Sequence, residues 1–394
     1  MRTLIFICSL IIITGCISQP PKDLNETNTI SALKYSLIPI DTVKIPIDTL
    51  TSNFNRFTQY KELNGQKLFA IYNSKAHKIQ AYNIESRESY LNINLNKEGP
   101  EEIPHLLGFH IHSFDSIFLF SFNENKILLI DSGGVMIDSY YLNETLEKEN
   151  NQFEMDMEFF FEVSYLSKNH LLTIWVAPLI SRATIEYFQY PLAVDYNIKT
   201  KKVEHNYGLY PENYRDNGIY YLLNSLGRIN TTAYDIHYFN CSHFLYLYDN
   251  TTKELVRKVY AKSQYLPDEI EPIMYPDDEK PILQEQANYH TTLGRYNKLH
   301  FDNENNLFYR FVNLPQELRA SDGLLNGKID NKFSVMILNA DFGISGEVEL
   351  PAKTFWDRTS FVSEGLLWIN INHPKNPLND ENYYQFIVYQ PALL

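Results

Sequence analysis

Cysteine is scarce in this chain of 394 residues, which contains only Cys8, Cys16 and Cys241. The first two belong to an N-terminal segment that we expect to be removed or modified, so Cys241 has no partner for an intramolecular disulfide. Cys241 lies among aromatic residues, and this setting predicts a small buried hydrophobic side chain. We therefore expect the protein to fold without disulfide bonds.

Sequence signatures of catalysis are also missing. The chain has no Gly-x-Ser-x-Gly elbow and no His-Glu-x-x-His motif. Its 15 glycines form no phosphate-binding loop. Composition still permits a Ser-His-Asp triad assembled from distant segments, because geometry rather than spacing defines such a site. We therefore expect a binding role rather than an enzymatic one, and no cofactor.

Basic residues are in the minority, with 34 Lys and Arg against 48 Asp and Glu and a formal net charge of −14. Nucleic-acid binding depends on basic side chains that neutralise phosphates, so this balance argues against a nucleic-acid partner. It also argues against adsorption on an anionic membrane surface. We expect any contact with a membrane to come from a covalent lipid alone.

The N-terminus has the features of an export signal. An apolar run from Leu4 to Ile13 follows Arg2 and is too short to span a bilayer as a mature helix. It ends in Ile13-Thr14-Gly15-Cys16, which resembles the lipobox of bacterial lipoproteins. We therefore predict cleavage after Gly15 and acylation of Cys16, for example with palmitate. No aspartate follows Cys16, which favours the outer membrane; the periplasmic and the external side both stay open.

The chain accordingly divides into three parts. Residues 1–15 are the predicted signal peptide, residues 16–32 a polar, flexible tether, and residues 33–394 the folded body. Tyr, Phe, Ile, Thr and Val are abundant in the body, which favours strands.

One unit recurs along the body: an apolar strand ends in a polar anchor, a short turn follows, and a second strand leaves it. Side chains of Asn and Asp suit this place because they accept hydrogen bonds from backbone amides two residues further on. The anchors are Asn83, Asp131, Asn197, Asp249, Asn339 and Gln390.

The intervals between these anchors are 48, 66, 52, 90 and 51 residues. A four-stranded propeller blade takes about 40 to 50 residues, so the pattern predicts an all-β, six-bladed β-propeller with two insertions. The last unit lacks an outer strand, whereas Tyr35–Ile47 predicts a strand without a unit of its own. We therefore expect this N-terminal strand to pair beside Phe386–Tyr389 and complete the last blade, which closes the ring.

Four short motifs stand out along the body: Lys97–Ile103, Lys262–Tyr265, Phe308–Val312 and Gly346–Pro351. They resemble motifs of one group of proteins, the TolB-like six-bladed β-propeller lipoproteins of Bacteroides-like bacteria, a group of unknown function. In the first motif Glu101 replaces a glycine of the group's pattern. This resemblance implies the fold and the location and carries over no catalytic residue.

Metal-binding patterns are weak. His110 and His112 alternate along an expected strand, which places both imidazoles on one face, and His105 or Asp115 could add a third ligand. No cysteine or paired carboxylate completes the set, so we predict an ordinary strand face and no metal. The acidic segment 267–279 lacks calcium-loop spacing and predicts a solvated insertion, and 302–306 predicts a hairpin turn.

The candidate ligand-binding residues lie in the 66-residue interval before Asn197 and in the segment between the third and fourth units. Propeller insertions emerge on the faces, where loops can cover the channel mouth, and Tyr and Arg are common interface anchors. An equally good interpretation is that these loops pack on the blades. We expect a protein, peptide or glycan partner, with an envelope hydrolase or lyase acting on carbohydrate or peptide as the alternative. The candidates are Tyr187, Tyr190, Tyr207, Tyr210, Tyr214, Arg215, Tyr220 and Tyr221.

Overall fold

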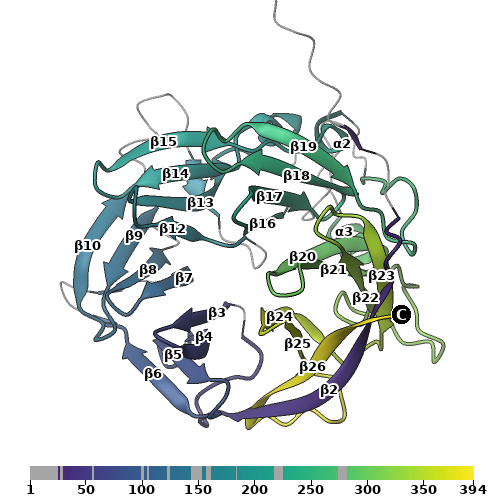
Figure 1. The fold of residues 1–394 in the computed structure, drawn as a ribbon, viewed down its shortest axis with the longest axis horizontal. Helices are drawn as coiled ribbons and strands as arrows, with labels where there is room; N and C mark the ends of the chain where they lie inside the picture. The colour runs from purple at the N-terminus through teal and green to yellow at the C-terminus, as the bar shows by residue number, and fades with distance from the viewer. Residues whose placement is uncertain are drawn as a thin grey trace, which may run out of the picture.

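The computed structural model describes most of the body, and it consists almost entirely of strands (Figure 1). The predicted signal peptide and Cys16 lie outside the described residues. These residues are 25–26, 30–55, 57–98, 102–103, 106–121, 125–142, 153–156, 161–182, 184–216, 225–273 and 282–394.

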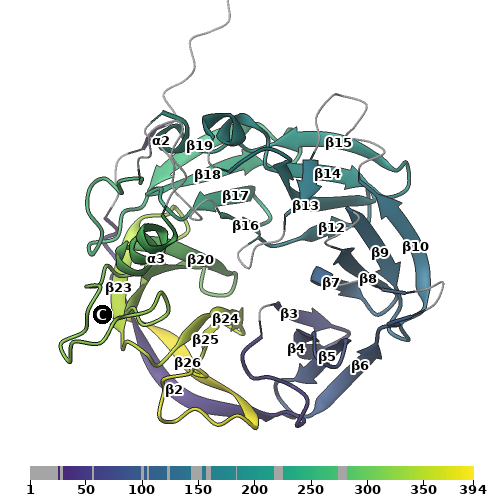
Figure 2. The same cartoon turned by 180° about the vertical axis from the view of Figure 1, so that it is seen from behind.

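Six antiparallel sheets stand in a ring around a central opening, which confirms the predicted six-bladed propeller (Figures 1 and 2). Each blade runs from an innermost to an outermost strand. The first three are β3 (Thr58–Leu63), β4 (Gln66–Asn73), β5 (Lys78–Asn83) and β6 (Ser89–Asn94); β7 (Leu106–Ser113), β8 (Ser116–Ser121), β9 (Lys126–Ile130) and β10 (Met136–Tyr141); and β12 (Ser164–Leu166), β13 (Leu171–Pro178), β14 (Ala193–Asn197) and β15 (Lys202–Tyr207), with β11 (Phe153–Met155) also paired to β13.

The other three blades complete the ring. The blades are β16 (Leu226–Asn230), β17 (Tyr234–Phe239), β18 (Phe244–Asp249) and β19 (Leu255–Tyr260); β20 (Arg295–Asp302), β21 (Leu307–Asn313), β22 (Phe333–Leu338) and β23 (Ile344–Leu350); and β24 (Trp356–Ser363), β25 (Leu366–Asn370), β26 (Tyr383–Leu393) and β2 (Tyr35–Pro46). Connecting segments contain the short helices η2 (Ile185–Gln189), α2 (Glu212–Asp216) and α3 (Leu283–Thr292). In Figure 2, α3 is seen in front of its blade between the labels of β23 and β20.

The outermost strand of blade 6 comes from the other end of the chain. β2 pairs with β26 from Tyr35 opposite Leu393 to Pro46 opposite Tyr383, and Val43 lies opposite Phe386 as expected from the sequence. Because β2 pairs along its whole length, β26 continues past Gln390 to Leu393.

The Asn and Asp anchors act as the sequence predicts. The Oδ1 atom of Asn83 accepts hydrogen bonds from the amides of Glu85 and Ser86 at 2.9 and 2.8 Å. Asp131, Asn197, Asp249 and Asn339 accept the equivalent amides of their own turns. The side chain thereby replaces the strand pairing that the backbone loses at the bend.

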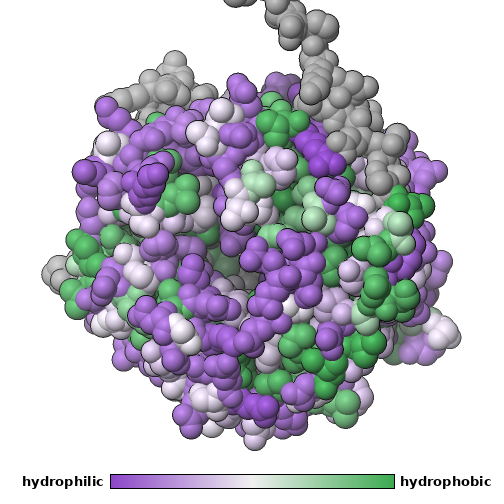
Figure 3. Space-filling model, in the orientation of Figure 1, coloured by the Kyte–Doolittle hydropathy of each residue, from purple (hydrophilic) through white to green (hydrophobic). Residues whose placement is uncertain are grey.

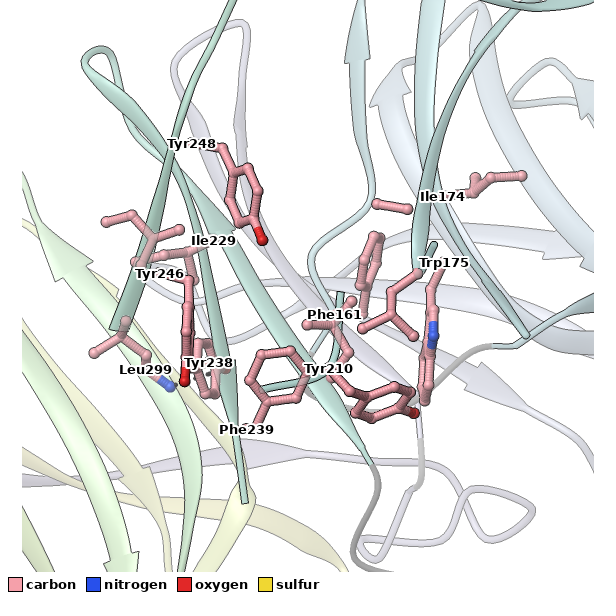
Figure 4. Packing of buried hydrophobic residues seen from close by; sticks show 14 of the residues in the cluster. Phe161, Ile174, Trp175, Tyr210, Ile229, Tyr238, Phe239, Tyr246, Tyr248 and Leu299 are labelled. Atoms are coloured by element: carbon pink, nitrogen blue, oxygen red, sulfur yellow. Dashed lines mark hydrogen bonds between the residues drawn. The ribbon is translucent and has the colours of Figure 1, made fainter. Parts of the chain in front are cut away.

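The core lies between the blades, because each blade packs both faces against its neighbours. All eight residues of β13 and all six of β22 are buried, so these middle strands are apolar on both faces. Figure 4 shows part of the core between blades 3, 4 and 5, where the rings of Phe161 and Trp175 stack at 6.4 Å. Cys241 is buried there as predicted, and burial raises the pKa of its thiol to about 12.

The described part of the predicted tether is paired with the propeller. β1 (Asn25–Glu26) lies parallel to β19 on the outer edge of blade 4, and the amide of Ser31 donates to the Ile344 carbonyl at 3.0 Å. No helix among the described residues has the length and apolar character that a membrane span requires.

Candidate functional site

The aromatic insertions pack largely into the body. Tyr187, Tyr210 and Tyr214 are at most 1% exposed. Phe188 joins them, with its ring 4.9 Å from that of Tyr210 and 5.8 Å from that of Tyr214. Through these rings η2 and α2 pack against blades 3 and 4.

The remaining candidates of this set have mixed positions. Tyr207, also buried, donates its hydroxyl to Asp235 at 2.6 Å, whereas Tyr190 and Arg215 are half-buried. Tyr220 and Tyr221 lie outside the described residues. A cavity of about 390 Å³ between blades 3 and 4 brings together Tyr207, Tyr210 and Arg215, but Tyr187, Tyr190 and Tyr214 do not line it.

A second cavity of about 340 Å³ follows the propeller axis and is lined by the innermost region of every blade. Figure 3 shows a hollow near the centre of one face, bordered largely by hydrophilic residues. The charged residues that line this channel are Lys61, Glu162, Arg228, Lys298 and Arg358, accompanied by the imidazoles of His110 and His300.

Hydrogen bonds between neighbouring blades hold these inner strands in place. The Lys298 ammonium donates to the carbonyls of Arg358 and Ser360 at 3.1 and 2.9 Å, which joins blades 5 and 6. Burial, opposed by Asp357 and Glu162, lowers the pKa of Lys298 to about 8. The ammonium is therefore still mostly protonated at neutral pH.

Arg228 lines the channel and has several hydrogen-bond and ion-pair partners. Its guanidinium binds the Asp235 carboxylate at 2.7 and 2.8 Å and donates to the Glu162 carbonyl at 2.5 Å. Both charged side chains are fully buried. Burial alone would raise the pKa of Asp235, but the Arg228 charge outweighs it and holds the pKa well below its usual range.

Glu162 differs because it has solvent access within the channel. The innermost regions of all six blades line the channel around it. Burial therefore raises the pKa of Glu162, while the Arg228 charge opposes the shift. Among the described residues, Glu162 is the one carboxylate in the lining of this channel.

The two histidines of β7 do not form a metal centre with other described residues. The His110 and His112 rings lie 6.4 Å apart, and His112 packs against Tyr165 with ring centroids at 4.9 Å. His105 is outside the described residues. Within the described ranges, no group of three or more His, Cys, Asp or Glu side chains could hold a metal ion.

A larger basin of about 770 Å³ shares Arg358 with the channel and lies beside α3. Its lining combines amide side chains with apolar ones, and the charged lining residues are Arg182, Arg295, Lys328, Asp357 and Arg358. Trp356 is covered, because Phe54 packs against its ring at 4.0 Å and the Arg358 guanidinium lies over it at 5.2 Å.

The lining of the channel and the basin has a charge balance opposite to that of the whole protein. Their lining contains seven Lys and Arg side chains and two carboxylates, in a chain whose net charge is −14. Since charges of one sign in a walled cavity concentrate counter-ions, this arrangement favours an anionic ligand. Sequence analysis missed these residues, because they come from separate blades and no local motif marks them.

Comparison with known proteins places the chain in a family. The family model of DUF4221, a domain of unknown function, matches residues 33–349. The chain belongs to the DUF4221 family. A DUF4221 member from Bacteroides vulgatus has a similar crystal structure, with a TM-score of 0.79 and 21% identity over 92% of this chain and 99% of that one.

A second solved structure shares the fold more distantly. It is a protein of Bacteroides fragilis described as a candidate exported protein, with a TM-score of 0.53 and 11% identity over 94% of this chain and 99% of that one. Comparison with curated proteins finds no match.

Three motifs of the family resemblance meet at one structural joint between blades 4 and 5. Glu347 accepts hydrogen bonds from the Ser263 hydroxyl at 2.6 Å and the Gln264 amide at 3.0 Å. Arg310 is fully buried and donates to the carbonyls of Ser242, His243 and Ala261. These motifs therefore stabilise the ring and do not line the channel or the basin.

Proposed function

We propose that this DUF4221 protein is a lipid-anchored binding module of the cell envelope that captures an anionic glycan at the mouth of its central channel. The observation that carries the proposal is the charge reversal of the channel and basin within an acidic protein. Guanidinium groups suit carboxylate and sulfate because they offer planar, paired donors.

The amide side chains of the basin favour a glycan over a simple ion. Asn and Gln offer both donors and acceptors, which matches ligands rich in hydroxyl groups. A basin of about 770 Å³ is within the range of small-molecule sites and accommodates a few sugar rings. The amides in the lining are Asn240, Gln284, Gln286, Asn288, Asn297, Asn313, Asn326 and Asn331.

The position of the N-terminal segment is compatible with membrane attachment. β1 lies on the outer edge of blade 4, away from the central opening (Figure 1). An acyl chain on Cys16 would therefore leave the basin accessible. The lipobox and the absence of aspartate beside Cys16 support an outer-membrane anchor in this proposal.

The test is binding of a glycan panel to the full chain, purified in mild detergent, by isothermal titration calorimetry. We expect binding of uronate-bearing or sulfated oligosaccharides, little binding of neutral ones, and a loss of about tenfold or more in Arg358→Gln. Lys44→Gln is the matched control, because Lys44 is exposed on the outermost strand of blade 6. Equal binding of neutral and acidic glycans would contradict the proposal.

A second candidate function is cleavage of the same ligand, either by hydrolysis or by elimination. It rests on Glu162, whose raised pKa suits a general acid, in a cavity that shares Arg358 with the proposed glycan site. New reducing ends or unsaturated products that disappear in Glu162→Gln would establish catalysis. Binding of the glycan without formation of cleavage products would support the binding module and not the enzyme.

A further inference from the structure

His110 lies at the wall of the channel, and its hydrogen bonds fix which ring nitrogen carries the proton. The Gln59 amide has a fixed orientation, since its Oε1 accepts the Ile111 amide at 2.8 Å and its Nε2 donates to the Ile111 carbonyl at 3.3 Å. The second hydrogen of Nε2 then points to His110 Nδ1 at 3.2 Å. Because Nδ1 accepts, the proton of the neutral imidazole is on Nε2.

This Nε2–H group has no partner of its own. His110 is 7% exposed and lines the channel, and no acceptor among the described residues lies within hydrogen-bond distance of Nε2. Buried donors are nearly always satisfied, so an unsatisfied one at a cavity wall points to a ligand atom that accepts. Burial, reinforced by Lys61, lowers the pKa of His110 to about 3, so the ring stays neutral.

Cations in the same channel define the charge of that ligand. Lys61 forms no ion pair with any described residue, although it acts electrostatically on His110 and on Glu162. Lys298 uses two of its three hydrogens on the carbonyls of β24, and one is left for the channel. Arg228 adds positive charge, although Asp235 compensates most of it.

We infer that the channel contains a site for a compact oxyanion, a carboxylate or a phosphate group, with His110 Nε2 as neutral donor and Lys61 and Lys298 as counter-charges. A cavity of about 340 Å³ has room for such a group and its hydration water. Glu162 opposes the anion by its own charge and thereby limits the affinity. The inference does not depend on glycan binding in the basin.

The experiment is a titration of the full chain with inorganic phosphate and, separately, with succinate, at constant ionic strength maintained with chloride. Saturable binding is expected, read out by calorimetry and by the rise in melting temperature. A preference for phosphate or for succinate identifies the group that the site takes. His110→Phe should weaken binding about tenfold or more, because it removes one hydrogen bond to a charged group.

Two further variants separate a lost site from a damaged fold. His112→Asn, two residues along β7 and outside the channel lining, should bind as the wild type does. Glu162→Gln should bind several-fold more tightly, because a like charge is removed, and a loosened fold would not produce that gain. The inference fails if neither anion binds saturably, or if His110→Phe and Glu162→Gln leave the affinity unchanged.

Discussion

Asp235→Asn tests how the protein keeps a charged arginine at its channel wall. Asparagine has nearly the same volume as aspartate, but its NH₂ group cannot accept the second hydrogen bond of the Arg228 guanidinium. Arg228 keeps its bonds to the Glu162 carbonyl and to the Ser164 hydroxyl at 2.5 and 3.1 Å. The substitution therefore removes the counter-charge and leaves the geometry nearly intact.

The expected loss of folding stability follows from the burial of the Arg228–Asp235 pair. Both Arg228 and Asp235 are fully buried, and removing one partner of such a pair costs about 3–5 kcal/mol. Glu162 acts electrostatically on Arg228 in the wild type as well, so it supplies no new counter-charge. Asp195, another carboxylate of this cluster, contacts Lys253 at 3.3 Å. It is not positioned to replace Asp235, so most of this loss should be measurable.

The assay is urea unfolding of the wild type and Asp235→Asn, followed by circular dichroism at several pH values. The folded-state pKa of Asp235 is depressed, so its carboxylate stabilises the wild type fully above the ordinary value of 3.8. That contribution is lost as the pH falls below this value. The difference in the free energy of unfolding between the wild type and Asp235→Asn should therefore become smaller there. A gap under about 1 kcal/mol at pH 7, the range of exposed ion pairs, would refute the reasoning.

Three other substitutions or conditions have distinct readouts. Arg310→Met leaves the Ser242 and Ala261 carbonyls without a donor among the described residues, and urea unfolding should show a loss of about 2–4 kcal/mol. In Gly346→Ala the new Cβ would lie 2.2 Å from the Tyr35 carbonyl oxygen, so β2 should shift and its amides exchange hydrogen faster. The phosphate affinity of the wild type relative to that of Glu162→Gln, followed by calorimetry, should rise as the pH falls through the raised pKa of Glu162. The ratio cancels the ionisation of phosphate itself, which affects both proteins alike.

The ring itself could be predicted because its signals are local. In five blades an anchor such as Asn83 or Asp249 sits at a hairpin bend, and the bend needs that side chain for its backbone amides. The sixth predicted anchor, Gln390, instead lies within β26 opposite Ile38. The strand at Tyr35–Ile47 has no unit of its own, and the last unit lacks an outer strand. Pairing the two is the arrangement that leaves no exposed sheet edge.

The channel could not be predicted in the same way. Lys61, His110 and Lys298 lie on β3, β7 and β20, and they share one cavity only after the blades close into a ring. The role of the aromatic insertions could not be decided from the sequence for a related reason: tyrosine suits both a ligand site and a core. Tyr210 and Tyr214 are buried against η2 and blade 4, a contact that composition does not specify.

The central cavity as an anion site is tested most directly by crystals of the full chain soaked in selenate and examined by anomalous diffraction. Selenate has the size and charge of a compact dianion and scatters strongly enough to be located without assumptions. A selenium peak inside the channel, with an oxygen within hydrogen-bond distance of His110 Nε2, is the predicted result. Peaks confined to the outer surface, with the channel free of selenium, would contradict it.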